Sequence, residues 1–193
     1  REEDMKPGAT GIAVPGYRVA ILDDNGVELP AGQVGRLAVK GPTGCRYLAD
    51  ERQKTYVYDG WNLPGDAARM DEDGYIWYEA RTDDMIVSSG YNVGAPEVEN
   101  ALLKHPAVSE CGVVGRQHDQ RGTIIKAYVV CADNIKSGSD LVVELQDHVK
   151  RTIAPYKYPR EVEFVNELPK TGTGKIQRFR LREMAQKEGA HNG

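Results

Sequence analysis

The sequence predicts an α+β fold in two parts, a small antiparallel β-barrel-like subdomain over residues 1–82 and a compact α+β domain over residues 83–193. Three observations carry this prediction. Residues 1–82 combine short alternating apolar and polar stretches with turn sequences, which is typical of antiparallel strands. After Arg81, amphipathic helical patterns alternate with strand patterns. The 21 glycines and ten prolines are spread along the chain, which indicates many tight turns rather than disorder.

The first part begins with a predicted strand that leads into the turn sequence Asp24-Asn25-Gly26. Such a turn after an alternating stretch is a strong hairpin signal. A short helix is predicted over residues 48–55, because Asp50 can cap it and the residues that follow favour helix. The predicted strands cover residues 17–23, 33–40, 65–70 and 75–79, and a turn is predicted at residues 71–74.

The second part predicts helices interleaved with strands. Pro96 suits a first helical turn, and Val98, Ala101 and Leu102 give the helix that follows one apolar face. A second amphipathic helix is closed by Pro155. The predicted strands cover residues 85–89, 91–93, 108–114, 123–131 and 162–165, and the predicted helices cover residues 96–104, 141–153 and 180–187.

Composition excludes several classes of function. The formal net charge is -4, so no nucleic-acid-binding surface is expected. No stretch approaches the roughly 18 apolar residues that a membrane span needs. Cys45, Cys111 and Cys131 are widely spaced and form no Cys-x-x-Cys pair, which favours reduced, buried thiols and a cytoplasmic location. The chain begins at Arg1 without a methionine, so a segment upstream is left open.

Residues 169–175 read Pro-Lys-Thr-Gly-Thr-Gly-Lys. Two glycines before Lys175 make a loop whose backbone can approach an anion closely. A lysine is a compact cation on a long stem, which suits it to stabilising the negative charge that develops during acyl or phosphoryl transfer. The segment is not a Walker A loop, because Pro169 stands where glycine is required and Ile176 where Ser or Thr is required. On spacing alone, a solvated turn with a surface lysine is the simpler interpretation.

A second candidate site surrounds Asp66, which follows a glycine at the start of a predicted strand. A carboxylate there can accept hydrogen bonds from the two vicinal hydroxyls of a ribose. Tyr78 can pack on a base, and Arg81 can bind a phosphate with two hydrogen bonds. The simpler alternative is that Asp66 and Arg81 form a structural ion pair and that Tyr78 belongs to the core.

Two further segments lie at and after the predicted boundary. Asp83 and Asp84 form a pair of carboxylates with no histidine beside them, which favours a capping or hinge role over acid–base chemistry. Residues 88–94 form a glycine-rich turn along which a thin ligand can lie, and a plain hairpin turn is the alternative.

The order and spacing of these segments are more specific than any one of them. Together they resemble the acyl-adenylate-forming superfamily, which includes acyl-CoA synthetases, luciferases and the adenylation domains of peptide synthetases. The resemblance covers essentially the whole chain. The matching stretches are residues 65–66, 71–75, 81–84, 90–93, 96–99, 105–108 and 169–175.

The resemblance implies a role for each candidate residue. Asp66 is similar to the aspartate that binds the ribose hydroxyls of ATP, Tyr78 to an aromatic residue near the nucleotide, and Arg81 to the arginine that contacts ribose and phosphate. Asp83 resembles the hinge about which a C-terminal lid turns between two half-reactions. Lys175 resembles the lysine that bridges the substrate carboxylate and the α-phosphate of ATP during adenylation.

The resemblance also implies contacts with CoA. Ser89, Gly90 and Tyr91 fall in the turn that such lids present to the pantetheine arm, and Lys150 lies at the position of a basic residue near the CoA nucleotide. One departure is Pro64, since the family usually has threonine before Gly-Asp. Proline lacks the hydroxyl and the backbone donor, which weakens the expected phosphate contact.

The implied reaction uses ATP, a carboxylic acid and CoA as co-substrate. The Mg²⁺ ligand, the phosphate-binding loop and most of the acid pocket of the family lie upstream of Arg1, so no metal site is expected within this chain. Residues 1–193 would then depend on the missing N-terminal domain and be inactive alone. Lys175, on an exposed loop, is also expected to be open to acetylation, which would remove its charge.

The acid itself is inferred from residues 41–48 and 60–62, which look most like the aromatic branch of benzoate-CoA and 2-aminobenzoate-CoA ligases, the latter more closely. One alternative is that these residues are scaffold shared with enzymes of aliphatic acids. Another is a domain that loads a carrier protein, although no carrier domain follows Gly193. A third is a non-catalytic nucleotide-binding module, against which the intact nucleotide-binding residues and Lys175 argue.

Overall fold

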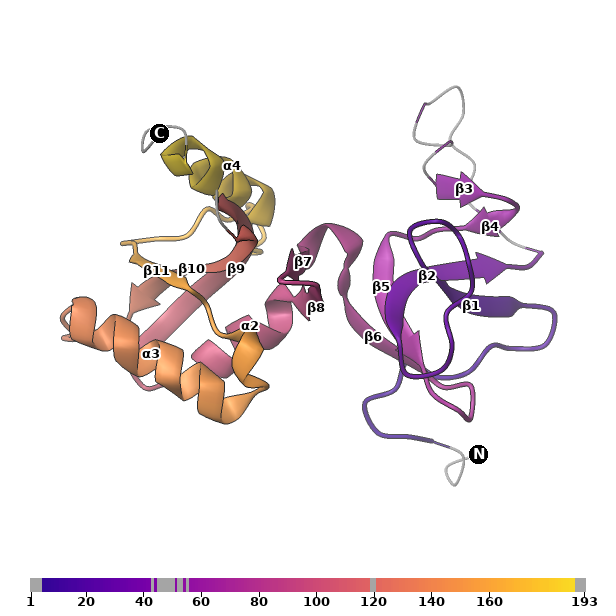
Figure 1. Ribbon diagram of the computed structural model, residues 1–193, viewed down its shortest axis with the longest axis horizontal. Helices are drawn as coiled ribbons and strands as arrows, with labels where there is room; N and C mark the ends of the chain where they lie inside the picture. Colours follow the sequence, from indigo (N-terminus) through magenta and orange to yellow (C-terminus); the bar gives the residue numbers. More distant parts are fainter. Residues whose placement is uncertain are drawn as a thin grey trace. The chain divides into compact units, whose positions relative to one another are not determined.

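A computed structural model describes residues 5–42, 44, 51, 54, 56–118 and 121–189. The chain divides into two compact units, unit 1 over Arg1–Asp83 and unit 2 over Asp84–Gly193 (Figure 1). Unit 1 consists mainly of antiparallel strands, whereas unit 2 combines helices with a mixed sheet. The predicted α+β class is therefore confirmed.

Unit 1 is built on a six-stranded sheet in which β3, β4, β2, β5 and β6 are neighbours in that order and β1 pairs with β2. All of these pairings are antiparallel. Successive side chains of a strand point to opposite faces, so β1 supplies Ala20 and Leu22 to one apolar cluster and Ile21 to another. The strands are β1 (Arg18–Leu22), β2 (Val34–Lys40), β3 (Val57–Tyr58), β4 (Trp61–Asn62), β5 (Asp66–Met70) and β6 (Ile76–Arg81).

The turn predicted at Asp24-Asn25-Gly26 is present, but the hairpin that it predicted is not a regular one. The carboxylate of Asp23 accepts hydrogen bonds from the backbone N–H of Asn25 at 2.9 Å and of Val27 at 2.7 Å. Beyond the turn, a single bridge joins Leu22 to Glu28, and the main partner of β1 is the later strand β2. A local turn signal does not specify which strand completes the pairing.

Unit 2 contains a three-stranded sheet in the order β11-β10-β9 and a separate two-stranded hairpin of β7 and β8. β9 and β10 are antiparallel, whereas β11 runs parallel to β10 because a helix crosses over between them. The elements are η2 (Thr82–Asp84), β7 (Met85–Ser88), β8 (Tyr91–Gly94), α2 (Ala95–Leu102), β9 (Val108–His118), β10 (Gly122–Cys131), α3 (Ser139–Thr152), η3 (Pro155–Lys157), β11 (Glu161–Phe164) and α4 (Arg178–Gly189).

Both faces of the three-stranded sheet are covered. α2 and α3 pack on one face, where Leu102 and Leu145 join Val113 of β9 in the larger apolar cluster. α4 packs on the other face, where Leu181 meets Val114 and Tyr128 (Figure 1). This three-layer arrangement fixes α4, and therefore the loop just before it, against the sheet.

The predicted elements of unit 2 are all present with shifted ends. β9 continues to His118 rather than ending at residue 114, and α4 begins at Arg178, two residues earlier than predicted. β11 starts one residue earlier than predicted and ends at Phe164. The helix predicted over residues 48–55 of unit 1 falls largely outside the described residues.

Candidate functional site

The predicted nucleotide-binding residues come together at the end of the β5–β6 pair in unit 1. Asp66 and Arg81 are directly opposite in the register, and Arg81 Nη1 donates a hydrogen bond to Asp66 Oδ1 at 2.8 Å. The same nitrogen donates to the carbonyl oxygen of Pro64 at 3.0 Å. Pro64 therefore orients the guanidinium through its carbonyl, which a proline supplies as well as any residue does.

A register shift places Tyr78 on the same face as this ion pair. Ala67 is opposite Ala80, whereas Ala68 is opposite Tyr78, so β6 contains one extra residue, Glu79, at this point. In a regular strand, residues three apart point to opposite faces, and the extra residue brings Tyr78 and Arg81 to one face. Tyr78 is 52% exposed, so it is not a core residue.

Gly65 makes room for the guanidinium. Its φ is +82°, a conformation that L side chains rarely adopt, and a Cβ atom at this position would lie 2.9 Å from Arg81 Nη2. Among the described residues, no group donates to Oδ2 of Asp66, so this oxygen can accept a hydrogen bond from a ligand hydroxyl. The pair thus presents both a carboxylate acceptor and guanidinium donors to a ligand.

Lys175 lies at the end of a small hairpin in unit 2. The backbone N–H of Thr171 donates to the carbonyl oxygen of Lys175 at 2.8 Å. The N–H of Gly174 donates to the carbonyl oxygen of Thr171 at 2.9 Å. Gln177 closes the base of the loop by donating to the carbonyl of Pro169 at 2.8 Å. Lys175 is exposed, and no described residue forms an ion pair with its ammonium group. Its charge is therefore available to an anionic ligand.

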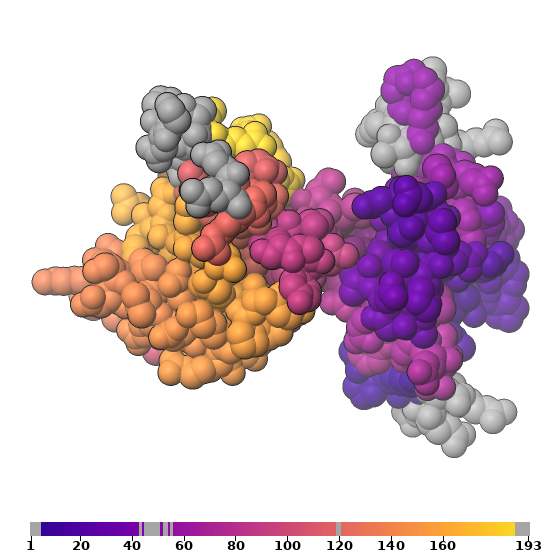
Figure 2. Space-filling model, in the orientation of Figure 1, coloured from indigo at the N-terminus to yellow at the C-terminus, as the bar shows by residue number. Residues whose placement is uncertain are grey.

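The turn between β7 and β8 exposes Ser89, Gly90 and Tyr91 at the surface of unit 2. The segment of β7 and β8 lies in the magenta region of Figure 2. Ser89 and Gly90 both have positive φ, 52° and 81°, as a two-residue type I′ hairpin requires. The ring of Tyr91 stacks on Tyr156 with centroids 4.3 Å apart. The three predicted residues are thus exposed in one tight turn.

Lys150 lies on α3 and is held in place by two neighbours. Its ammonium nitrogen donates to Asp147 Oδ1 at 2.9 Å and lies 4.5 Å from the ring centroid of Tyr158. The hydrogen bond from Lys150 lowers the pKa of Asp147. Tyr158 was not singled out in the sequence, because it follows the end of α3, between η3 and β11, and belongs to no regular pattern.

Of the two carboxylates at the boundary, Asp84 is bound by two arginines of α4. Asp83 and Asp84 both belong to η2, and Asp84 is the first residue of unit 2. Oδ1 of Asp84 accepts a hydrogen bond from Arg182, and Oδ2 accepts one from Arg178, each at 3.1 Å. Neither arginine was identified from the sequence, since more than 90 residues separate them from Asp84.

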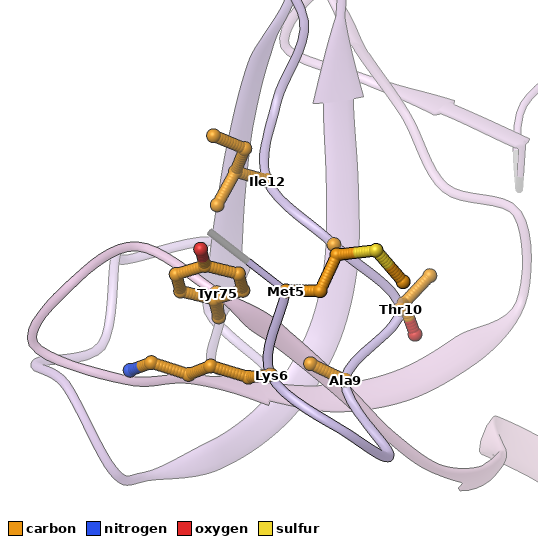
Figure 3. A pocket seen from close by; sticks show the side chains of 7 residues that line it. Met5, Lys6, Ala9, Thr10, Ile12 and Tyr75 are labelled. Atoms are coloured by element: carbon orange, nitrogen blue, oxygen red, sulfur yellow. The ribbon is translucent and has the colours of Figure 1, made fainter. Parts of the chain in front are cut away.

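Two cavities among the described residues do not coincide with these sites. One, of about 320 Å³, is lined by an N-terminal segment and Tyr75 (Figure 3). The cation at its edge is neutralised, because Lys6 Nζ lies 2.8 Å from Asp71 and 2.6 Å from Asp73. These hydrogen bonds raise the pKa of Lys6 and hold the pKa of Asp71 well below its usual range. The cavity therefore offers no free charge to a phosphate.

The other cavity, of about 380 Å³, lies beside the ends of β10 and β11. Cys131 contributes to its wall, and no predicted site residue does. Within the described residues, no cluster of three or more His, Cys, Asp or Glu side chains could hold a metal ion. No helix in that part of the chain is long and apolar enough to cross a membrane.

Comparison with known proteins places this chain in a family. Residues 97–175 match the AMP-binding enzyme C-terminal domain family. Over 94% of its length, the chain is homologous to part of AMP-forming acyl-CoA ligases.

Two curated relatives illustrate this homology. The chain is 48% identical to a protein of Bacillus subtilis described as the uncharacterized acyl-CoA ligase YtcI, over 94% of this chain and 35% of the relative. It is also 48% identical to the human mitochondrial acyl-coenzyme A synthetase ACSM4, over 94% of this chain and 33% of the relative. The chain therefore spans about a third of the length of these relatives.

Solved structures give the same assignment. An anthranilate CoA ligase, AuaEII, in complex with anthranoyl-AMP superposes with a TM-score of 0.80 at 38% identity, over 98% of this chain and 37% of that one. ATP-bound MatB from Rhodopseudomonas palustris superposes with a TM-score of 0.74 at 32% identity, over 92% of this chain and 36% of that one.

Proposed function

We propose that this chain is the C-terminal part of an ATP-dependent, AMP-forming acid–CoA ligase, with unit 2 as its mobile lid and Lys175 as its catalytic cation. The observation that carries the proposal is the exposed Lys175 hairpin, whose ammonium group is unpaired among the described residues, in a chain 48% identical to acyl-CoA ligases. ATP and CoA are the co-substrates that this family assignment supports.

In the first half-reaction, a carboxylate oxygen of the acid attacks the α-phosphorus of ATP. The bond from the α-phosphorus to the bridging oxygen breaks, which gives an acyl-adenylate and pyrophosphate. Negative charge accumulates between the attacking and α-phosphoryl oxygens, and Lys175 supplies positive charge there. A lysine held on a short hairpin can reach this point without itself being buried.

In unit 1, Asp66, Tyr78 and Arg81 bind the nucleotide. The Oδ2 oxygen of Asp66 accepts from the ribose hydroxyls, while the guanidinium of Arg81 holds Oδ1 and keeps donors available for ribose or phosphate oxygens. Tyr78, exposed on the same face, packs near the base. The described residues offer no carboxylate cluster for Mg²⁺, so we assign no step in this chain to the metal.

In the second half-reaction, the thiol of CoA loses its proton and its sulfur attacks the acyl carbon, which releases AMP. We propose that the lid turns about Asp83, which removes Lys175 and brings the turn of Ser89, Gly90 and Tyr91 to the pantetheine arm. Lys150 would then approach the CoA nucleotide. One mobile domain can in this way serve two steps at a single site.

We propose an aromatic acid of the benzoate or 2-aminobenzoate type as the substrate. The likeness to an anthranilate CoA ligase supports this choice, while the likeness to acyl-coenzyme A synthetases favours an aliphatic acid as the alternative. A panel of 2-aminobenzoate, benzoate and a straight-chain acid, assayed by AMP release with the full-length enzyme, separates the two. Turnover of only the straight-chain acid would refute the aromatic assignment.

Lys175→Ala in the full-length protein tests the central assignment. Adenylate formation should fall by about 100-fold or more, while thioester formation from supplied acyl-adenylate is largely retained, because Lys175 acts only in the first step. Lys104→Ala is the matched control, since Lys104 is also an exposed lysine of unit 2. Unchanged half-reactions in Lys175→Ala would refute the role of Lys175.

Assays of the two half-reactions in the full-length protein also separate the rival classes of function. A non-catalytic nucleotide-binding module would release no AMP with any acid, and a carrier-loading domain would form adenylate but no CoA thioester. Acetylation of Lys175 would reproduce the loss in Lys175→Ala, and mass spectrometry after treatment with an acetylating reagent detects it.

Two expectations about the chain as a whole stay predictions. Residues 1–193 alone should show no ligase turnover, and AMP release by this fragment would overturn that expectation. The cytoplasmic location also stays a prediction, because relatives with equal identity include a protein named as mitochondrial.

A further inference from the structure

Four charged side chains meet where α4 begins. Asp84 comes from η2, Glu99 from α2, and Arg178 and Arg182 from α4. We call them the α4 network. Only 8% of the Glu99 side chain and 11% of the Asp84 side chain are exposed, against 23% for Arg178. Two carboxylates are thus taken out of water and matched by two guanidinium groups.

Arg178 is the centre of this α4 network. Its Nε donates to Glu99 Oε1 at 2.9 Å, and its Nη2 donates to Glu99 Oε2 at 2.6 Å. Its third nitrogen, Nη1, donates to Asp84 Oδ2 at 3.1 Å. Glu99 also accepts from the backbone N–H of Val113 at 2.9 Å, which attaches the α4 network to β9. One planar guanidinium therefore bridges the sheet, α2 and η2.

The α4 network is continuous with the lysine hairpin. Arg178 is three residues after Lys175, and Gln177 between them closes the base of the hairpin on Pro169. Ile176 packs against the apolar cluster under α4. The exposed end of the hairpin makes no such contact with the core, so its position depends on where its base and the first turn of α4 are held.

The α4 network is equally continuous with the entrance to unit 2. Asp84 follows Asp83 directly, and both of its carboxylate oxygens are bound to α4. Through a single side chain, the first residue of unit 2 is joined to the helix that follows the Lys175 hairpin. None of the four side chains lies at the candidate binding surfaces, so the α4 network acts on the hairpin from behind rather than by contact with a ligand.

We propose that Arg178 is a positioning residue that fixes the Lys175 hairpin relative to the entry segment at Asp84, so that the lysine and this first residue of unit 2 move as one body. This inference rests on the proposed function of Lys175. Arginine is required because its fork donates to two carboxylates at once, whereas a lysine in its place retains the charge and loses the planar geometry.

Arg178→Lys in the full-length ligase is the principal test. The kcat of ATP–pyrophosphate exchange should fall about 100-fold, as expected for a displacement of the catalytic group by about 1 Å. The KM for ATP should stay within about threefold, because the nucleotide is bound by unit 1. Thioester formation from supplied acyl-adenylate should stay within about threefold of the parent.

Hydrogen exchange supplies a readout independent of turnover. In Arg178→Lys, the amides of Thr171, Gly174 and Gln177 should exchange at least about tenfold faster, while the amides of β9 keep their protection. Arg180→Lys is the matched control, because Arg180 is exposed on the same helix and lies outside the α4 network. It should leave both half-reactions and the exchange pattern unchanged.

Asp84→Asn is the second variant, in case Arg178→Lys does not fold. It preserves the size of the side chain and the bonds between Arg178 and Glu99, and removes the charge that holds the entry segment. Adenylation should fall about tenfold with the thioester step retained, which corresponds to the loss of one charge-assisted hydrogen bond.

Three outcomes contradict the inference: adenylation in both variants equal to that of Arg180→Lys, an equal fall in both half-reactions, or unaltered exchange in the hairpin. Lys175→Ala separates this failure from a failure of the proposed function. If Lys175→Ala abolishes adenylation while Arg178→Lys and Asp84→Asn do not, only the positioning role is refuted. If Lys175→Ala is itself active, the function assigned to the hairpin fails.

Discussion

Glu99→Gln gives the sharpest test of how unit 2 is held together. The substitution preserves the size of the side chain but replaces one carboxylate oxygen by an NH₂ group that faces donors. Glu99 is buried and accepts hydrogen bonds from Val113 and, twice, from Arg178. Removing one partner of a buried ion pair costs about 3–5 kcal/mol. Arg178 keeps Asp84 as a partner and is partly exposed, which points to the lower end, about 3 kcal/mol.

The chain provides a separate signal for each unit. Both tryptophans, Trp61 and Trp77, belong to unit 1, so their fluorescence follows that unit. The helices α2, α3 and α4 belong to unit 2, so the far-ultraviolet circular dichroism at helical wavelengths follows mainly that unit. In urea, about 3 kcal/mol should lower the midpoint of the dichroism transition by about 1.5–2 M. The fluorescence midpoint should not move.

Glu110→Gln is the matched control. Glu110 pairs with Lys170 at 2.6 Å in the same unit, but 39% of its side chain is exposed. Pairs of this kind contribute about 0–1 kcal/mol, so the midpoint should fall by less than about 0.5 M. If Glu99→Gln shifted the midpoint no more than Glu110→Gln, the buried network would not be a source of stability and the reasoning would be wrong.

Three smaller predictions follow from local chemistry. The pKa of Asp71 is lowered, so its ion pair stabilises unit 1 above the unfolded value near pH 4 and loses this contribution as the pH falls further. In Asp71→Asn, the stability of unit 1, followed by tryptophan fluorescence, should therefore depend less steeply on pH between about pH 4 and 2. Burial raises the pKa of Cys111 to about 12. Iodoacetamide at pH 8 should therefore label Cys131 before Cys111, as mass spectrometry can show. Equal labelling of both would contradict that burial. Gly90→Ala should destabilise unit 2 by about 1–2 kcal/mol in urea because of its positive φ, and Ser89→Gly should cause no loss.

The sequence predicted the class of the fold and the main elements of unit 2 because these depend on local periodicity. Val98, Ala101 and Leu102 make an apolar stripe in the sequence and pack together in the structure. The ends of strands were less predictable, because they depend on how far the neighbouring strand pairs. β9 extends to His118 because β10 pairs with it up to that residue. The partner of β1 was missed for the same reason, as the turn after it closes only one bridge.

The residues of the candidate site were chosen from the sequence, and their roles stay predictions, whereas their geometry came only from the structure. Asp66 and Arg81 were grouped by their chemistry and then by resemblance, and their register explains why they meet. The ion pair that served as the alternative interpretation is present, and it leaves one carboxylate oxygen for a ligand. Arg178 was missed, because its partner Glu99 lies 79 residues away and nothing in the local sequence marks Glu99 as buried.

The register shift in β6 absorbs one residue without changing the face on which Tyr78 lies. Glu79 is the residue without an opposite partner, so Tyr78 and Arg81 are three residues apart and still face the same way. Replacing Glu79 by another side chain removes its ion pair with Arg69 and leaves the length of the strand unchanged. Deleting Glu79 would leave Tyr78 and Arg81 two residues apart, and in a regular strand such residues also share a face. Homologues that share this surface should therefore tolerate the loss of this residue, whereas one further residue inserted without a second bulge would turn Tyr78 to the opposite face.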